Sequence, residues 1–174
     1  GMPGGRIELQ LTPLDADTYP VTGLENVEFL VSANPGQPAR PLTKVASGGE
    51  LSRISLAIQV VAASHSTIPS LVFDEVDVGI SGATAEIVGQ LLRKLGENGQ
   101  VMTVTHLPQV AAQAHQHLHI EKRAKRDTTL THMALLDERG RISELARMLG
   151  GVTLSDQTLA HAREMLHASQ RPPH

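Results

Sequence analysis

The sequence predicts a three-layer α/β lobe built on a mainly parallel sheet, with a small antiparallel element near its start. Residues 6–11 and 27–31 alternate polar and apolar side chains, which is the period of two half-buried antiparallel strands. Residues 71–73 and 101–105 are short apolar or β-rich runs, as expected of buried parallel strands. Residues 83–95 between them follow a helical pattern. Strand, helix and strand in this order predict a parallel pair with a right-handed crossover.

The remaining elements follow from apolar spacing and from breaker residues. Leu51, Ile54, Ile58 and Val61 recur at helical spacing directly after a Gly-Gly pair, so a helix is expected to begin there. Further along we expect a short helix at 108–114, strands at 117–122 and 129–135, and helices at 142–149 and 155–168. We expect one domain over residues 1–170, with antiparallel strands in 1–40 and the main lobe in 41–170, and a flexible tail at 171–174.

The composition excludes several classes of site and partner. The 174 residues include no cysteine and no tryptophan, which excludes disulfides and cysteine metal sites and leaves little basis for aromatic stacking on bases. A net charge of −3 provides no global basic field for nucleic acid. No apolar stretch approaches the roughly 18–20 residues that span a bilayer, and no export signal is evident. We therefore expect a cytoplasmic protein with no membrane partner.

Two acids and a histidine stand where the predicted parallel strands end. Ligands of open α/β sheets bind at those carboxyl ends, which Asp74, Glu75 and His106 occupy. An apolar strand followed by two acids is the arrangement of a Walker B site: Asp74 would hold Mg²⁺, and Glu75 would be the general base or orient the attacking water. His106 could reach a terminal phosphate at the same rim. The alternatives are that the acids simply end a strand and that the histidine is structural.

The segment before the first long helix has the features of an anion site. The helix opens with Ser47, Gly48, Gly49 and Glu50. Free N–H groups and the positive dipole end can hold a phosphate there, and glycines permit its close approach. The same residues can form an ordinary capping box between Ser47 and Glu50, and both readings can hold together. Chance rarely places such a helix start, the two acids, Asp77 and a Thr-His strand end in this order.

Three stretches carry a resemblance to a known family. They are Lys-Val-Ala-Ser-Gly-Gly-Glu-Leu-Ser-Arg at 44–53, Phe-Asp-Glu-Val-Asp-Val-Gly-Ile-Ser-Gly at 73–82 and Val-Thr-His-Leu-Pro-Gln-Val at 104–110. Over most of its length the chain resembles the C-terminal half of ABC-type ATPase heads in the SMC-like group, and within that group the RecN family of bacterial DNA-repair proteins. The first motif, the Asp-Glu pair and the histidine are shared by many ABC ATPases. The stretch Val-Asp-Val-Gly-Ile-Ser-Gly points more narrowly to RecN and argues against a transporter ATPase.

The resemblance implies a P-loop NTPase-type fold and an ATPase that uses ATP and Mg²⁺. Ser47 to Glu50 would be the signature motif, which in such families contacts the γ-phosphate of ATP held by the opposite protomer. Asp77 would be the D-loop acid at the same dimer interface, and His106 the switch histidine. The implied partners are the N-terminal P-loop half of the same protein, a second head in a head-to-head homodimer, and DNA ends or single-stranded regions during double-strand break repair. The implied location is the cytoplasm, at the nucleoid.

One element of the family is missing from the sequence. No Gly-x-x-x-x-Gly-Lys-Ser/Thr occurs, so we expect that the chain alone neither binds ATP tightly nor hydrolyses it. The family keeps this P-loop in its N-terminal half, upstream of a coiled coil, which implies that the chain is part of a longer protein. The second hypothesis is a non-catalytic dimerisation or DNA-binding module that retains the ATPase lobe. DNA-stimulated ATP turnover distinguishes the two.

Two lesser features have mainly structural interpretations. The basic run from Lys122 to Arg126 is typical of a solvated hairpin tip, with DNA contact as the alternative. His115, His117 and His119 alternate, so on a strand they would share a face and could mimic metal ligands. Without supporting acids or cysteines we interpret them as ordinary edge residues.

Overall fold

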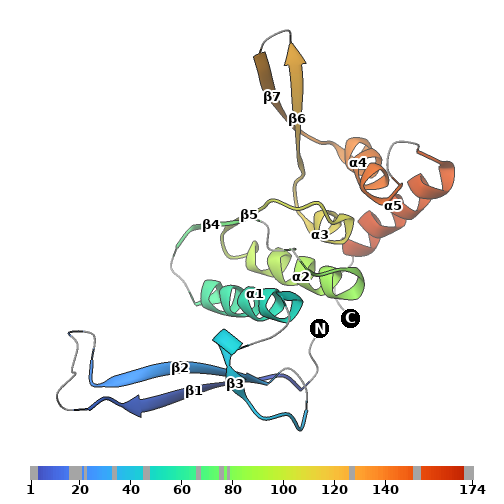
Figure 1. Cartoon of the computed structure of the whole chain (residues 1–174). Helices are drawn as coiled ribbons and strands as arrows, with labels where there is room; N and C mark the ends of the chain where they lie inside the picture. The colour runs from blue at the N-terminus through green and yellow to red at the C-terminus, as the bar shows by residue number, and fades with distance from the viewer. Residues whose placement is uncertain are drawn as a thin grey trace. The chain divides into compact units, whose positions relative to one another are not determined.

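The structure is a computed structural model of the whole chain (Figure 1). It describes residues 4–15, 21, 23–32, 35–44, 48–65, 68–74, 77, 79–125, 128–150 and 154–170. The chain divides into two compact units, Gly1–Ala57 and Ile58–His174, each of which is described by itself. The division falls within helix α1 (Gly48–Ser64). The predicted tail at 171–174 lies outside the described residues.

The first unit is built on an antiparallel sheet with the strand order β1-β2-β3 (Figure 1). Strands β1 (Arg6–Pro13) and β2 (Glu25–Ser32) confirm the two strands predicted from alternation. A short β3 (Arg40–Pro41) and a 3₁₀ turn η2 (Leu42–Lys44) were not predicted. Leu9 pairs with Phe29 across the ladder, and because directly opposed residues share a face, one face of the β1/β2 hairpin is apolar.

The second unit contains the predicted strand-helix-strand unit. Strand β4 (Ser70–Phe73) pairs in parallel with β5 (Gln100–Thr103), and α2 (Gly82–Leu95) connects them. The buried face of α2 consists of Ala85, Val88, Gly89 and Leu92. At Gly89 the helix passes so close to its neighbour that an added Cβ would lie 2.7 Å from Cγ of Gln113. The α/β class and the parallel pairing are therefore confirmed.

The rest of the second unit is a short helix, a hairpin and two longer helices. Helix α3 (Pro108–Gln113) follows β5, and the antiparallel strands β6 (Leu118–Lys125) and β7 (Thr128–Leu135) form a separate two-stranded sheet. Helices α4 (Glu138–Gly150) and α5 (Asp156–Ser169) complete the unit. Ser155 caps α5 by accepting a hydrogen bond from the N–H of Thr158 at 3.1 Å. No helix in the described part of the chain is long and apolar enough to cross a membrane.

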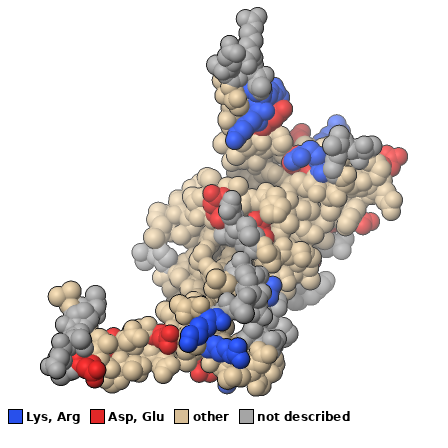
Figure 2. Space-filling model, viewed as in Figure 1, with Lys and Arg blue, Asp and Glu red and all other residues tan. Residues whose placement is uncertain are grey.

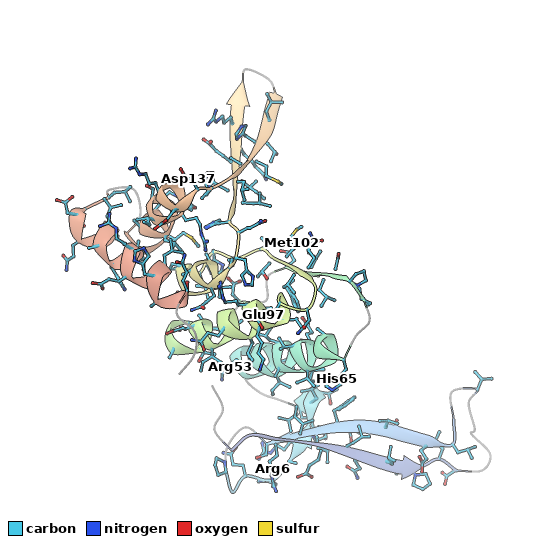
Figure 3. All side chains as sticks on the ribbon, turned by 180° about the vertical axis from the view of Figure 1, so that it is seen from behind. Arg6, Arg53, His65, Glu97, Met102 and Asp137 are labelled. Atoms are coloured by element: carbon cyan, nitrogen blue, oxygen red, sulfur yellow. The ribbon has the colours of Figure 1, made fainter. Side chains whose placement is uncertain are left out.

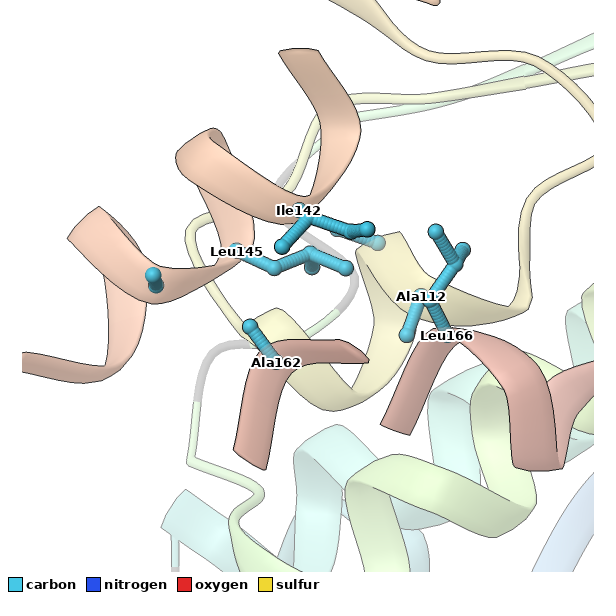
Figure 4. Close-up of a cluster of buried hydrophobic side chains, with 7 residues drawn as sticks. Ala112, Ile142, Leu145, Ala162 and Leu166 are labelled. Atoms are coloured by element: carbon cyan, nitrogen blue, oxygen red, sulfur yellow. The ribbon is translucent and has the colours of Figure 1, made fainter. Parts of the chain in front are cut away.

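One core cluster of this unit lies between α3, α4 and α5 (Figure 4). Leu145 of α4 and Leu166 of α5 are fully buried, as are the alanines that let these helices approach. Burial of one such leucine side chain contributes about 1.5–3 kcal/mol. The complete cluster is Ala111, Ala112, Ile142, Leu145, Ala146, Ala162 and Leu166. This core anchors α3, which directly follows the strand end that carries His106.

Polar side chains from three helices bind the end of α3. Arg141 of α4 donates to the carbonyls of Ala112, Ala114 and His115, at 3.4, 2.6 and 3.3 Å. Arg93 of α2 donates to the carbonyl of Gln113 at 2.6 Å. Ser169 of α5 donates to the carbonyl of Ala112 at 2.8 Å, which Arg141 also binds. Burial, and then the neighbouring charge of Arg93, lower the pKa of Arg141. Because the last carbonyls of a helix have no partner inside it, these donors act as its C-terminal cap.

Candidate functional site

The carboxyl ends of β4 and β5 lie side by side, as the sequence predicts for Asp74 and His106. The N–H of Val104 donates to the carbonyl of Phe73 at 2.9 Å, which continues the pairing past the end of β4. Asp74 follows directly and is exposed, and His106 stands three residues beyond β5. The structure therefore brings Asp74 and His106 to one rim of the parallel pair.

The carboxylate of Asp77 connects these two strand ends. Its side chain is only 1% exposed, although no cation of Lys or Arg is paired with it in the described residues. Instead Oδ2 accepts a hydrogen bond from the Thr105 hydroxyl and another, at 3.2 Å, from the N–H of His106. The Thr105 hydroxyl oxygen in turn accepts from the N–H of Leu107 at 3.0 Å. A buried carboxylate is costly unless it is hydrogen-bonded, so these contacts hold the loop after β4 on the loop after β5.

The imidazole of His106 is the exposed member of this group. Its side chain is 74% exposed, and its Nδ1 lies 3.6 Å from Oδ2 of Asp77. Helix α3 begins two residues after His106, because Leu107 is extended and Pro108 occupies the first turn of the helix. One ring nitrogen thus faces a buried carboxylate while the ring as a whole remains open to a ligand.

The backbone after Asp77 turns tightly before α2 begins. The N–H of Ile80 donates to the carbonyl of Asp77 at 3.3 Å, and Ile80 is buried. Gly79 has a φ of 77°, a left-handed conformation that glycine adopts without the steric cost of a Cβ. This hydrogen bond links the backbone of Asp77 to Ile80, two residues before α2 begins.

Several predicted site residues are not part of this geometry. Ser47 and Glu75 lie outside the described residues. Gly48, Gly49 and Glu50 form the first turn of α1, as predicted, but they belong to the other compact unit. The structure therefore brings together Asp74, Asp77 and His106 and leaves the signature segment as a separate prediction.

A metal ion at this rim would need ligands beyond the side chains that the structure describes. Among the described residues no three His, Cys, Asp or Glu side chains converge on one point. Asp74 offers a single exposed carboxylate at the strand end. Mg²⁺ is commonly held by one or two carboxylates together with substrate phosphates and water, so this donor set suits a metal that arrives with a nucleotide.

A groove at the opposite end of the strands is a different feature. It has a volume of about 350 Å³ and is lined by side chains that include Val61, Ile68, Leu91, Lys94 and Gln100. Gln100 begins β5, so the groove lies at the amino ends of the strands, away from Asp74 and His106. Phosphate sites of α/β sheets lie at the carboxyl ends, and the groove is therefore not the candidate nucleotide site.

One face of the parallel pair is uncovered within this unit. Val72, Met102 and Val104 are 68%, 47% and 50% exposed, and Figure 3 shows the Met102 side chain at the surface of β5. Val72 and Met102 are directly paired and so share a face. Parallel sheets are nearly always covered on both faces, so this exposed apolar face is a candidate packing surface.

The histidines before and within β6 differ from the simple edge residues that the sequence suggests. His119 Nδ1 lies 3.4 Å from Oε2 of Glu144, and Arg147 also binds that carboxylate, at 2.5 Å. The hydrogen bond from Arg147 is the main cause that lowers the pKa of Glu144. Burial, and next the charge of Arg141, lower the pKa of His117. These histidines therefore pack against α4 at the base of the hairpin.

The basic run of the hairpin is only partly described. Figure 2 shows Lys and Arg side chains on the β6/β7 hairpin, where Lys122 and Arg123 are exposed. Arg123 forms an ion pair with Glu121 at 2.8 Å. The side chain of Lys125 and all of Arg126 lie outside the described residues. Of the two described cations, Lys122 is therefore the better placed to meet an anion.

Sequence reasoning missed Thr105 and Arg141. In the sequence Thr105 is marked only as the neighbour of His106, because its role depends on the burial of Asp77, which no local pattern indicates. Arg141 stands next to an apolar helical stripe, and an arginine there is normally read as solvated. A threonine directly before the histidine at a strand end was the one signal available.

Known proteins with one name in common are similar to most of this chain. No family model matches the chain. DNA repair protein RecN of Vibrio cholerae is 60% identical over 147 residues, which cover 84% of this chain and 26% of that protein. RecN of Xylella fastidiosa (strain Temecula1) is 52% identical over 170 residues, which cover 98% of this chain and 30% of that protein. The chain thus spans less than a third of the length of these curated relatives.

Solved structures support the fold. The Smc head domain with a coiled coil and joint from Pyrococcus yayanosii has a TM-score of 0.64 at 21% identity and covers 83% of this chain and 26% of its own. A structure concerned with ATP-driven dimerization and DNA stimulated activation of SMC ATPases has a TM-score of 0.63 at 20% identity, over 87% of this chain and 85% of its own. At this level of identity the likeness establishes the fold, a lobe of the SMC head type.

Proposed function

This chain belongs to the RecN family, spanning 26–30% of the relatives named above, and from that premise we propose that it is the C-terminal ATPase-head lobe of a DNA double-strand break repair protein. The observation that carries the proposal is the placement of Asp74, Asp77 and His106 at the adjoining ends of β4 and β5. These are the strand ends at which an α/β sheet binds phosphate.

The residues at this rim have distinct roles in ATP hydrolysis. Asp74 would hold Mg²⁺, whose charge stabilises the phosphate oxygens as negative charge develops. Glu75, the next residue in the chain, orients the attacking water and accepts its proton. His106 presents its exposed imidazole to the terminal phosphate. Because these groups must act on one phosphate, the common position of Asp74 and His106 at the rim supports the assignment. Glu75 is assigned from its place in the sequence directly after Asp74.

The P-loop half of the same protein is the first partner. The chain has no P-loop of its own, so the groups that cradle the β- and γ-phosphates must be supplied in another segment. The uncovered Val72 and Met102 of the parallel pair supply a surface for it. Covering this face would also give the sheet the two-sided burial that parallel sheets require.

The signature segment acts across a head-to-head dimer. Ser47 to Glu50 lead into α1, a 17-residue helix whose N-terminus favours an anion. A Ser47→Arg substitution would fill this anion site with a bulky cation and prevent ATP-dependent dimerisation of the complete head. Ala57→Arg, at an exposed position of the same helix, is the matched control. Dimerisation of the Ser47 variant at the wild-type ATP concentration would exclude the role in trans.

DNA ends or single-stranded regions are the proposed substrate of the assembled protein, in the cytoplasm at the nucleoid. The support is the family and the exposed Lys122 of the hairpin. A single cation contributes modestly to phosphate binding, and its effect declines with salt. DNA-stimulated turnover that falls in Lys122→Gln at low salt would support this contact, and unchanged stimulation would place the DNA surface elsewhere.

The test of the function is ATP hydrolysis by this lobe, alone and after mixing with the P-loop half. We expect turnover only in the mixture. Glu75→Gln should abolish it while leaving the ATP-bound dimer intact, because the amide keeps the shape of the carboxylate but cannot accept a proton. Glu97→Gln is the control, since Glu97 follows α2 near the amino end of β5 (Figure 3). A stable mixture without ATPase activity would instead favour the non-catalytic dimerisation or DNA-binding module.

A further inference from the structure

Among the described residues, the hydrogen bonds of the Asp77 carboxylate come from the segment that carries His106. Its Oδ2 accepts from the Thr105 hydroxyl and from the His106 N–H at 3.2 Å, and the Leu107 N–H closes the group by donating to Thr105 at 3.0 Å. The residues belong to two loops that are 28 positions apart in sequence. One carboxylate oxygen thus fixes two loops that the proposed function places beside the same phosphate.

Because this carboxylate is buried, the loss of one of its hydrogen bonds would cost more free energy than at an exposed site. Asp77 is one of the largest fully buried side chains among the described residues, and a buried charge that lost a hydrogen bond would not find water in its place. The Thr105 hydroxyl donates its one proton to the carboxylate and receives the Leu107 N–H on its oxygen. Its donor and acceptor functions are both used, so a side chain without a hydroxyl cannot replace it.

The structure also places one ring nitrogen of His106 beside this carboxylate. Nδ1 of His106 lies 3.6 Å from Oδ2 of Asp77 while the side chain remains 74% exposed. A carboxylate facing Nδ1 favours the neutral tautomer that carries its proton on that nitrogen. Nε2 is then the ring nitrogen presented to the phosphate rim.

We propose that Thr105 is a positioning residue for ATP hydrolysis, which holds the buried Asp77 carboxylate so that it fixes the backbone and ring orientation of His106 within one lobe. This inference deepens the proposed function and rests on it. It also assigns the Asp77 side chain an internal role: the carboxylate is turned toward Thr105 and His106, even where the surrounding loop meets a second protomer.

The experiment compares Thr105→Val with Thr105→Ser in the complete head formed with the P-loop half. Valine keeps the shape of threonine and removes the hydroxyl, whereas serine retains it. We expect Thr105→Val to lower kcat by at least about tenfold, the lower bound to which the loss of one hydrogen bond to a charged group corresponds, without changing KM for ATP. Thr105→Ser should remain within about twofold of wild type. Thr103→Val, two residues earlier in β5, is the control and should leave kcat unchanged.

A second readout follows the histidine itself. Ring ¹⁵N resonances of His106, assigned by their loss in His106→Gln, report which nitrogen carries the proton. Wild type, Thr103→Val and Thr105→Ser should show the proton on Nδ1, whereas Thr105→Val should show a mixture of the two tautomers. Far-UV circular dichroism of each variant checks that the lobe is folded.

The outcomes separate this inference from the function on which it rests. Wild-type kcat and an unchanged ring signature in Thr105→Val would overturn it. Loss of kcat with an unchanged ring signature, or without rescue by serine, would overturn it as well, because the threonine would then be merely structural. A wild-type complete head without ATPase activity would refute the proposed function, while the ring signature would still show whether Thr105 orients His106.

Discussion

Arg141→Met is the substitution that most directly tests the packing around α3. The wild-type guanidinium is buried and donates to the carbonyls of Ala112, Ala114 and His115. Methionine keeps the apolar stem and the helix propensity of α4 but supplies no donor. The carbonyl of Ala112 keeps its hydrogen bond from the Ser169 hydroxyl at 2.8 Å. The variant therefore leaves two carbonyls, those of Ala114 and His115, without their donor.

The size of the effect follows from these two carbonyls. A hydrogen bond from a charged donor contributes about 1.5–3 kcal/mol, so two correspond to roughly 3–6 kcal/mol. Part of this is offset, because the variant no longer buries a charge, and burial is the main cause that lowers the pKa of Arg141. We expect a net loss of about 2–4 kcal/mol in the free energy of unfolding.

Urea unfolding followed by far-UV circular dichroism measures this loss. With a slope of about 1–3 kcal/mol per molar urea, the urea midpoint should fall by about 0.7–4 M. Arg139→Met is the matched control, because Arg139 is exposed on the same helix, and its effect should stay within about 0.5 kcal/mol. If Arg141→Met were as stable as Arg139→Met, the reasoning that buried carbonyls require the guanidinium would be refuted.

Two further predictions concern the α2–α3 contact and the base of the hairpin. Gly89→Ala should lower Tm by the equivalent of about 1–3 kcal/mol, because the new Cβ would lie 2.7 Å from Cγ of Gln113 and 3.2 Å from the carbonyl of Gln109; a higher Tm would exclude such a close approach. Burial and then Arg141 lower the pKa of His117 below 6.5, so the unfolded chain binds this proton more readily and stability is lost as the pH falls below about 6.5. His117→Gln should flatten the decrease of Tm between about pH 7 and pH 5, and profiles of equal slope would contradict the assignment.

Much of the fold could be predicted because its elements carry local patterns. The alternation in β1 and β2 and the apolar run in β4 gave the correct strands, and the parallel pairing followed from the helix between β4 and β5. Helix α4 begins at Glu138 rather than at the predicted residue 142. Its first turn contains Gly140, which interrupts the pattern, but Asp137 caps it by accepting from the Gly140 N–H at 2.7 Å.

Local sequence patterns did not predict where strands β5 and β6 end. Residues 101–105 read as one β run, yet β5 ends at Thr103. The Thr105 hydroxyl is bound to Asp77 instead, a contact between residues that no periodicity relates. Conversely, β6 extends through a basic segment predicted as a tip, because ladder pairing such as that of Arg123 with Leu130 requires only backbone groups. The order of the site residues was therefore readable, whereas their connections depended on burial.

The cap on α3 has a consequence for hydrogen exchange. A helix of six residues is too short to be stable alone, yet side chains of α2, α4 and α5 bind its last carbonyls. Its backbone can open only when those helices loosen as well, so the amide of Ala111, bonded to the Leu107 carbonyl at 3.0 Å, should exchange with the whole unit rather than by local fraying. The exposed His106 imidazole is therefore adjacent to a segment whose backbone amides should be among the slowest to exchange in the lobe.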